Sequence, residues 1–446
     1  MIKLITFTEN KKMRLKLQNI GIIESADINV DGITLIAGQN DSGKSTVGKV
    51  LYSIVRSFNI NEKSFNSSKV EYIRNRNRDI RNLLLRTKSV TETDKTINEK
   101  FLNDFVDNRQ SIFNRLIRIN TNNPDYIDKM LVDLDLIEEL YSSFSNETLK
   151  LQLENFIIEI KNRLEIERES VEVLIYELES YLEDQFGKQI KNKFSKEDSF
   201  ILIDDKYQKK ILINDKLEFK GFEQNNNFYY DEVFFIESPI LLEKSSYWLP
   251  ESTSRDKNTY LNTKIFEPEI EQDIFSDNRE DFEKLSSIIS EVIGGNFEIN
   301  SNEELVFKKS DVEFDFENIA TGIKSFGILQ LLFKKGKLNS NTLLIIDEPE
   351  VHLHPTWQVK YAEILVLLSK EFAIPILLTS HSPYFIEALE AFTKKYKYLD
   401  STNFYFAEKS ENGLTSNILN VNDSLSKIYS SISEASYQLR NIESDE

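Results

Sequence analysis

The chain has 446 residues, of which 40% are hydrophobic and 29% are charged, so it is long enough for a large core and more than one domain. It carries 55 Lys and Arg against 74 Asp and Glu, and this net charge of −19 argues against a surface built for nonspecific nucleic-acid binding, although a local basic groove stays possible. Cysteine is absent, which excludes disulfides, zinc fingers and thiol nucleophiles.

The sequence begins with MIKLITFTENKK, which lacks the apolar core and the cleavage site of a signal peptide. No later apolar run approaches the roughly 20 residues of a membrane span. We therefore expect a cytoplasmic protein with no membrane partner. The stretch that follows the first residues is predicted to form short alternating strands.

A glycine-rich loop comes next, after a predicted buried strand at residues 33–37 and before a predicted helix. Its sequence GQNDSGKS matches the phosphate-binding pattern G-x-x-x-x-G-K-S/T, and the alternative is a glycine turn without a ligand. The two glycines let the backbone curl so that successive N–H groups face one anion, and the helix adds its positive end. Lys44 would reach the β and γ phosphates of ATP, and the Ser45 hydroxyl would ligate Mg²⁺. The predicted ATP-binding residues are Gly38, Asn40, Asp41, Ser42, Gly43, Lys44, Ser45 and Thr46.

From residue 58 to residue 197 the sequence is rich in Asn, Glu, Lys and Arg, with apolar residues at helical spacing. The segments 101–119 and 153–160 predict helices that pack, so we expect a compact inserted helical domain. The basic run at residues 72–88 could meet phosphates or an acidic partner, but such a run is more often a solvated helix face. A β-hairpin is predicted at residues 199–215, where the chain leaves the insert.

An apolar run at Leu343–Ile346 predicts a buried parallel strand that ends in Asp347 and Glu348. Ligands bind at such strand ends in open α/β sheets. We predict that Asp347 holds Mg²⁺ and that Glu348 orients and deprotonates the attacking water. A helix N-terminus rich in acidic residues is the alternative for either carboxylate alone.

A second buried strand is predicted at Ile374–Thr379, and His381 follows it. From that strand end His381 could contact the γ phosphate, whereas a lone histidine is more often a structural hydrogen-bonding residue. All three histidines of the chain lie at the ends of these two strands, which favours a functional role for His381. His352 and His354 are better explained as residues that shape a loop or an interface.

The C-terminal part is predicted to contain a hairpin around residues 410–414 and an amphipathic helix near residues 424–439. This helix could be a dimer or partner surface, and packing on the core is an equal alternative.

Together the segments GQNDSGKST, ATGIKS, LLIIDEPEVHLHP and LLTSHSP resemble ABC-type ATPase heads, specifically the SMC-like and OLD-like AAA ATPases common in bacterial phage-defence systems. The resemblance covers about residues 1–60 and 230–420. It implies an α/β fold: a P-loop ATPase head with a mixed, partly parallel core sheet, N-terminal antiparallel strands and an inserted α-helical domain. The expected parts are the N-terminal part of the head at 1–57, the insert at 58–197, the C-terminal part of the head at 198–422 and a helix or tail at 423–446.

The resemblance also implies roles for residues that the motifs alone leave open. Thr321, Gly322, Lys324 and Ser325 occupy the place of the signature loop, in a degenerate form, which in the family binds the γ phosphate held by the opposite subunit. A helix N-cap without a ligand is the alternative. Glu237, at the end of a predicted strand, is the candidate for the metal-associated position called the glutamine loop in relatives.

The expected function is an ATP-binding and ATP-hydrolysing homodimer, or an oligomer of dimers, that uses ATP and Mg²⁺ and controls a separately encoded nuclease or toxic effector. The pair Asp133 and Asp135 lies in a Leu-rich stretch, and we see no acidic cluster suited to a two-metal nuclease. The first alternative is a repair or recombination clamp on duplex DNA. In the expected effector-controlling function, any contact with nucleic acid would be indirect. A transporter ATPase subunit is a further alternative, which the long insert and the EPE-x-x-LHP pattern oppose.

Overall fold

The structure is a computed structural model that describes residues 13–60, 146–165, 171–187, 189–204, 208–213, 217–220, 228–237, 256–267, 279–302 and 304–431, with scattered positions between 65 and 138. Its contacts divide the chain into two compact units. The first comprises Met1–Asn59, Leu174–Leu249 and Arg255–Glu446, and the second comprises Ile60–Val173 and Pro250–Ser254. None of the described helices is long and apolar enough to cross a membrane.

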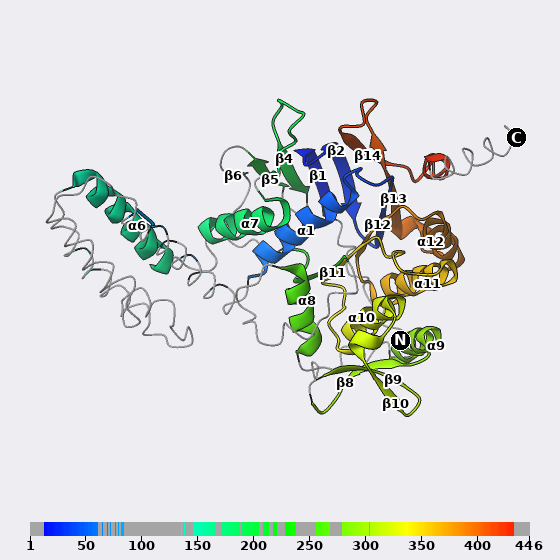
Figure 1. The fold of residues 1–446 in the computed structure, drawn as a ribbon. Helices are drawn as coiled ribbons and strands as arrows, with labels where there is room; N and C mark the ends of the chain where they lie inside the picture. The colour runs from blue at the N-terminus through cyan, green and yellow to red at the C-terminus, as the bar shows by residue number, and fades with distance from the viewer. Residues whose placement is uncertain are drawn as a thin grey trace, which may run out of the picture. The chain divides into compact units, whose positions relative to one another are not determined.

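The first unit contains a sheet of 11 described strands in the order β6-β5-β4-β1-β2-β14-β13-β3-β12-β11-β7 (Figure 1). Its strands are β1 (Met13–Ile20), β2 (Ile23–Val30), β3 (Ile33–Ala37), β4 (Phe200–Asp204), β5 (Gln208–Ile213), β6 (Leu217–Lys220), β7 (Glu232–Ile236), β11 (Thr342–Asp347), β12 (Ile376–Ser380), β13 (Thr402–Lys409) and β14 (Ser416–Asn420). Strands β13, β3, β12, β11 and β7 run parallel to one another, whereas β2, β1, β4, β5 and β6 are antiparallel neighbours. The mixed sheet with antiparallel N-terminal strands confirms the predicted α/β class.

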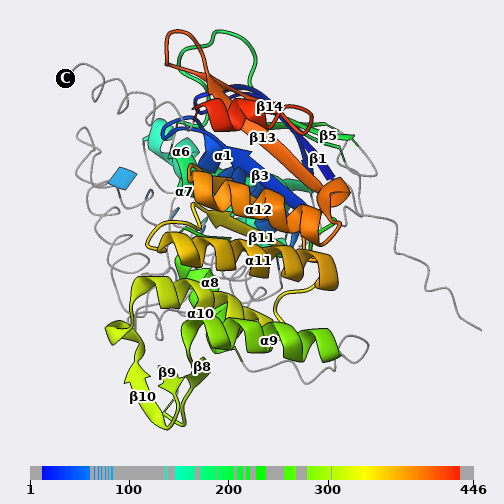
Figure 2. The same ribbon diagram turned by 90° about the vertical axis from the view of Figure 1, so that its right-hand side faces the viewer.

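Helices cover the parallel strands on both faces, which explains their unbroken apolar sequences. Leu343 and Ile345 of β11 belong to one core with helix α1 (Lys44–Phe58), and Leu344 and Ile346 belong to the opposite core. The opposite core is formed with α8 (Lys257–Phe266), α9 (Arg279–Ile293), α10 (Thr321–Lys334), α11 (Pro355–Phe372) and α12 (Pro383–Lys395), of which the last four lie side by side in Figure 2. Each fully buried Val, Leu or Ile stabilises the fold by about 1.5–3 kcal/mol.

A separate antiparallel sheet of three described strands leads into α10 (Figure 1). It consists of β8 (Asn296–Ile299), β9 (Leu305–Lys309) and β10 (Val312–Asp315), followed by the short helix η5 (Phe316–Asn318). A second short helix, η6 (Leu399–Ser401), precedes β13. Two residues, Ile319 and Ala320, connect η5 to Thr321, so this small sheet directly precedes the predicted signature helix in the chain.

The second unit contains α6 (Glu147–Glu165) and the first residues of α7 (Val171–Phe186). Helix α6 buries Leu153, Ile157 and Ile160 on one face, as the predicted periodicity of segment 153–160 requires. The predicted helix at 101–119 lies outside the described residues. In the basic run, the described Arg76 is half-buried and pairs with Glu159 of α6 at 2.7 Å.

The boundary between the units lies at residues 173 and 174, earlier than the end of the predicted insert at residue 197. Most of α7 belongs to the first unit because Leu178, Tyr181 and Leu182 pack in the core shared with α1. At the other end of the chain, residues 426–431 are helical, Ile428 is fully buried and the hydroxyl of Tyr429 bonds to Glu390 of α12. The described part of the C-terminal helix therefore packs on the core.

Candidate active site

The predicted site residues lie at one edge of the sheet, where its parallel strands end. Ala37 at the end of β3 is paired with Ser380 of β12, and Thr379 of β12 is paired with Asp347 of β11. The glycine-rich loop and the residues after β11 and β12 therefore begin at adjacent positions. This is the edge at which open α/β sheets bind their ligands.

The loop between β3 and α1 is held by hydrogen bonds to its own backbone and to the end of β12. The Ser42 hydroxyl donates to the Gln39 carbonyl at 2.7 Å, and the Gly38 amide donates to a carbonyl at the end of β12 at 3.2 Å. Gly43 has a φ of 82°, and a Cβ there would lie 2.8 Å from Cγ1 of Ile23, so only glycine fits. Asn40 and Asp41 are exposed on this loop, and Thr46 lies in the first turn of α1.

Lys44 is 4% exposed and points back over the loop. Its Nζ donates to the Gln39 carbonyl at 2.7 Å and lies 4.0 Å from Oε1 of Glu348. Burial lowers the pKa of the Lys44 ammonium, and the neighbouring carboxylates Glu348 and Asp347 oppose this effect. A phosphate group in the loop would supply this buried cation with a counter-charge.

Ser45 and Asp347, which are 302 residues apart in the chain, are in contact. The Ser45 hydroxyl donates to Oδ1 of Asp347 at 2.9 Å, and the Thr379 hydroxyl donates to the same oxygen. Burial raises the pKa of the Asp347 carboxyl, although both hydroxyl bonds lower it. A hydroxyl beside a carboxylate suits Mg²⁺, which prefers oxygen ligands and is held by one or two carboxylates together with substrate phosphates. Within the described ranges no cluster of three or more His, Cys, Asp or Glu side chains could hold a metal.

Glu237 follows β7, beside the strand that carries Asp347. The pairing of Ile236 with Ile346 brings its position next to Asp347. Its carboxylate forms an ion pair with Lys257 of α8 at 2.8 Å. Glu237 is thus near the predicted metal residues but is engaged by a cation, and its role as the glutamine-loop position stays a prediction.

Glu348 and His381 also meet, although they follow different strands. His381 Nδ1 lies 3.2 Å from Oε1 of Glu348. Glu348 adopts a φ of 52°, and its amide donates to both the carbonyl and the hydroxyl of Thr379 at 3.1 Å. Since this left-handed conformation is unfavourable for a glutamate, the bonds from the neighbouring strand help to hold the carboxylate where it faces Lys44 and His381.

Two residues of the site had no predicted role. The sequence places Thr379 in a predicted strand and Glu350 in the EPE motif, and neither position predicts a role in the site. Glu350 is 5% exposed, and its Oε1 accepts hydrogen bonds from the segment that carries His381. An acidic residue in a loop that ends up buried has no local sequence signal, because its partners lie about thirty residues further along the chain.

The predicted signature residues begin helix α10. Gly322 permits a close approach to the loop after β11, since a Cβ there would lie 3.1 Å from the carbonyl oxygen of His352. Lys324 and Ser325 are buried: Lys324 Nζ lies 4.6 Å from the Phe316 ring, and the Ser325 hydroxyl donates within the helix. Thr321 is half-buried at the helix N-terminus. Of the four residues, Thr321 at the start of the helix is the one that is not buried.

The other two histidines occupy the loop before α11. His354 caps the helix, with Nδ1 accepting from the Thr356 amide at 3.3 Å. His352 is exposed and has a φ of 66°. His354 therefore makes a contact that shapes the start of the helix.

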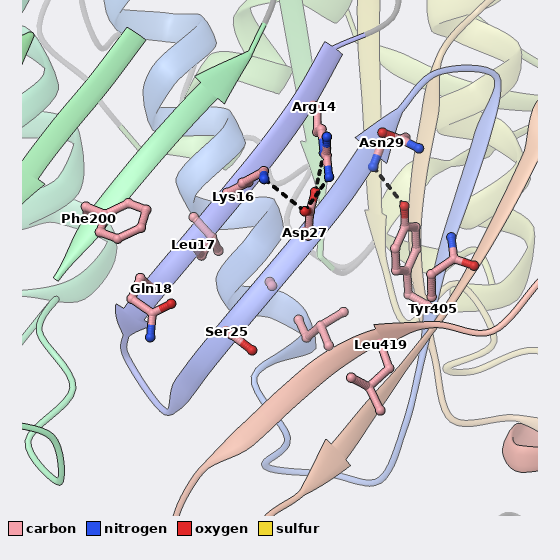
Figure 3. Close-up of a pocket in the computed structure, with 13 residues that line it drawn as sticks. Arg14, Lys16, Leu17, Gln18, Ser25, Asp27, Asn29, Phe200, Tyr405 and Leu419 are labelled. Atoms are coloured by element: carbon pink, nitrogen blue, oxygen red, sulfur yellow. Dashed lines mark hydrogen bonds and ion pairs between the residues drawn. The ribbon is translucent and has the colours of Figure 1, made fainter. Parts of the chain in front are cut away.

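A recess of about 720 Å³ lies elsewhere, on the open face of strands β1, β2 and β14 (Figure 3). Arg14 binds Asp27 through two nitrogens at 2.5 and 2.6 Å, and Lys16 lies 3.2 Å from the same carboxylate. Both cations of the recess thus share one carboxylate, that of Asp27. The predicted nucleotide-binding residues are not among those that line it.

Comparison with known proteins gives one family and, among solved structures, several SMC heads. Residues 13–386 match the family described as AAA ATPase domain. Among solved structures, the SMC head domain from Thermotoga maritima shares 10% identity over 92% of this chain and 99% of that chain, with a TM-score of 0.39. An SMC head bound to the C-terminal winged-helix domain of ScpA shares 10% identity over 93% and 97%, with a TM-score of 0.38. An SMC head from Pyrococcus furiosus, with an extended coiled coil and bound to the C-terminal domain of ScpA, shares 13% over 98% and 100%, at 0.34. No curated protein matches the chain's sequence.

Proposed function

We propose that this chain, which belongs to the AAA ATPase domain family, binds Mg-ATP at the edge of its sheet and hydrolyses it to ADP and phosphate. The observation that carries the proposal is the convergence of Lys44, Ser45, Asp347, Glu348 and His381 on one edge from three separate strand ends. Phosphoryl transfer requires mainly positioning and charge stabilisation, and these side chains supply a cation, metal ligands and a base.

Each residue has a defined part in this reaction. Lys44 exchanges the Gln39 carbonyl for the β and γ phosphates, and Ser45 with Asp347 holds Mg²⁺. Glu348 orients the attacking water and takes its proton, while His381 faces the γ phosphate beside Glu348.

The test is phosphate release by the purified protein and by two variants. Lys44→Ala should lose both ATP binding and turnover because the buried cation is removed. Glu348→Gln keeps the shape of the site and should bind Mg-ATP with turnover reduced about 10²–10⁴-fold, the range of general-base catalysis. Unchanged turnover in either variant would reject the assignment.

We further propose that the active form is a pair of chains, with the start of α10 of one chain against the nucleotide of the other. The first amides of a helix lack intrahelical acceptors and, with the helix dipole, favour an anion. The resemblance to phage-defence ATPases supports a switch that controls a separately encoded nuclease or toxic effector. Co-purification of the Glu348→Gln protein with the product of an adjacent gene, with and without Mg-ATP, tests this. Nucleotide-dependent binding of duplex DNA without such a partner would instead support a DNA clamp.

A further inference from the structure

Glu350 is a buried carboxylate two residues beyond the proposed general base. Its Oε1 accepts three hydrogen bonds from consecutive residues at and after the end of β12. These come from the Ser380 hydroxyl at 2.8 Å, the His381 amide at 2.8 Å and the Ser382 amide at 3.1 Å. One oxygen of Glu350 therefore binds three consecutive residues, 380–382, of the segment that carries His381.

Burial of this carboxylate is costly. Removing a charged group from water costs several kcal/mol unless hydrogen bonds replace the lost hydration. Oε1 has its three donors, whereas Oε2 is buried without a hydrogen-bond partner among the described residues. An apolar side chain would be easier to bury at this position. The carboxylate instead stabilises the conformation of residues 380–382 through its hydrogen bonds.

The ordered segment determines where the His381 ring lies. The backbone amide of His381 donates to Oε1 of Glu350. In this position, Nδ1 of the His381 ring lies 3.2 Å from Oε1 of Glu348 and 3.5 Å from Oε1 of Glu350. The segment has one further anchor, since the Ser382 hydroxyl donates to Gln358 of α11 at 2.6 Å. Loss of the Glu350 contacts would loosen His381 without releasing the whole segment.

We infer that Glu350 is a positioning residue for ATP hydrolysis, which fixes the backbone of His381 so that its ring stands against Glu348. This rests on the proposed function. Glu350 acts through the length and direction of its side chain: an acceptor must reach the three donors, and its negative charge is secondary.

Two substitutions separate length from charge. Glu350→Gln keeps the length and one carbonyl oxygen but removes the charge. Glu350→Asp keeps the charge but withdraws the acceptor by roughly 1.5 Å, one C–C bond. A misplacement of about 1 Å near the chemistry can cost roughly 10²-fold in rate. We expect kcat to fall about 10–100-fold in Glu350→Asp and to stay within about threefold of wild type in Glu350→Gln.

The binding of ATP should be unaffected in both variants, because the contacts of Lys44 and Ser45 are untouched. The readouts are kcat and KM for ATP hydrolysis and the Kd of a fluorescent ATP analogue. Glu363→Ala is the matched control: this carboxylate ties α11 to α12 through Lys395 at 3.1 Å and Tyr396 at 2.7 Å, away from the site, and kcat should not change.

The reverse order, with Glu350→Asp active and Glu350→Gln inactive, would show that charge matters and would overturn the inference. Wild-type kcat in both variants would also overturn it, as would an equal loss of kcat and ATP affinity. Failure of the proposed function looks different, because wild-type protein would then show no ATP hydrolysis sensitive to Lys44→Ala.

Discussion

Replacing Thr379 by Val removes one hydroxyl from the centre of the site. Thr379 is 1% exposed, and its hydroxyl donates to Oδ1 of Asp347 and accepts from the Glu348 amide at 3.1 Å. A hydrogen bond to a charged group contributes about 1.5–3 kcal/mol. The Glu348 amide keeps its second acceptor, the Thr379 carbonyl. Losing its bond to the Thr379 hydroxyl therefore changes the free energy of unfolding little. We therefore expect the free energy of unfolding to fall by about 1.5–3 kcal/mol.

The same change should weaken the use of Mg²⁺. If Ser45 ligates Mg²⁺, as proposed, Thr379 would be the main hydroxyl that still orients Asp347. If about 1.4 kcal/mol of this orienting contribution is lost in the metal-bound site alone, the Mg²⁺ concentration for half-maximal hydrolysis should rise roughly tenfold.

Urea unfolding and Mg²⁺ titration of ATP hydrolysis measure these effects. Thr393→Val is the matched control, because Thr393 is fully buried and donates to the Glu390 carbonyl at 2.9 Å within α12. Loss of this neutral bond should cost about 0.5–1.5 kcal/mol and leave the Mg²⁺ dependence unchanged. If the two variants behave alike in both assays, the bond from Thr379 to Asp347 does not have the importance given to it.

Two further predictions follow from buried contacts. Burial lowers the pKa of Lys44 below its ordinary 10.5, so protonated Lys44 destabilises the folded state at neutral pH. This cost disappears as the pH rises past the pKa values of Lys44 in the folded and in the unfolded protein. Lys44→Met should therefore raise the Tm of the nucleotide-free protein at pH 7, with a gain that shrinks toward pH 10.5 in thermal unfolding, and a lower Tm at pH 7 would contradict this. Gly327→Ala in α10 would place a Cβ 2.3 Å from the ring of the buried Phe297. Overpacking of about 1–3 kcal/mol should outweigh a gain in helix propensity of about 1 kcal/mol, so urea unfolding should show lower stability, and a more stable variant would refute the close contact.

The sequence predicts the parts of the site whose signals are local. The buried strands before Gly38 and Asp347 are apolar on both faces, and the glycine pattern lies between β3 and α1 as its sequence predicts, so both are predictable. The contact of Ser45 with Asp347 follows once these strands are neighbours, but their order in the sheet depends on pairings between distant segments, such as Thr402 with Ile33.

Other features have no local signal. Most of helix α7 belongs to the first unit because Tyr181 packs edge-on against Tyr52 of α1 at a centroid distance of 6.2 Å, a contact between residues far apart in sequence. Glu350 is polar in sequence and buried in the fold, because the register of β11 against β12 brings the amides after β12 to its carboxylate. Such residues become recognisable only when the strand ends are seen together.

The most direct test of the ATP switch is the mass of the Glu348→Gln protein in solution, measured by light scattering with and without Mg-ATP. This variant should bind ATP without cleaving it, and a nucleotide-dependent rise from the mass of one chain to that of two would support two heads closed around ATP. A mass that does not change on addition of Mg-ATP, in protein shown to bind the nucleotide, would contradict the account.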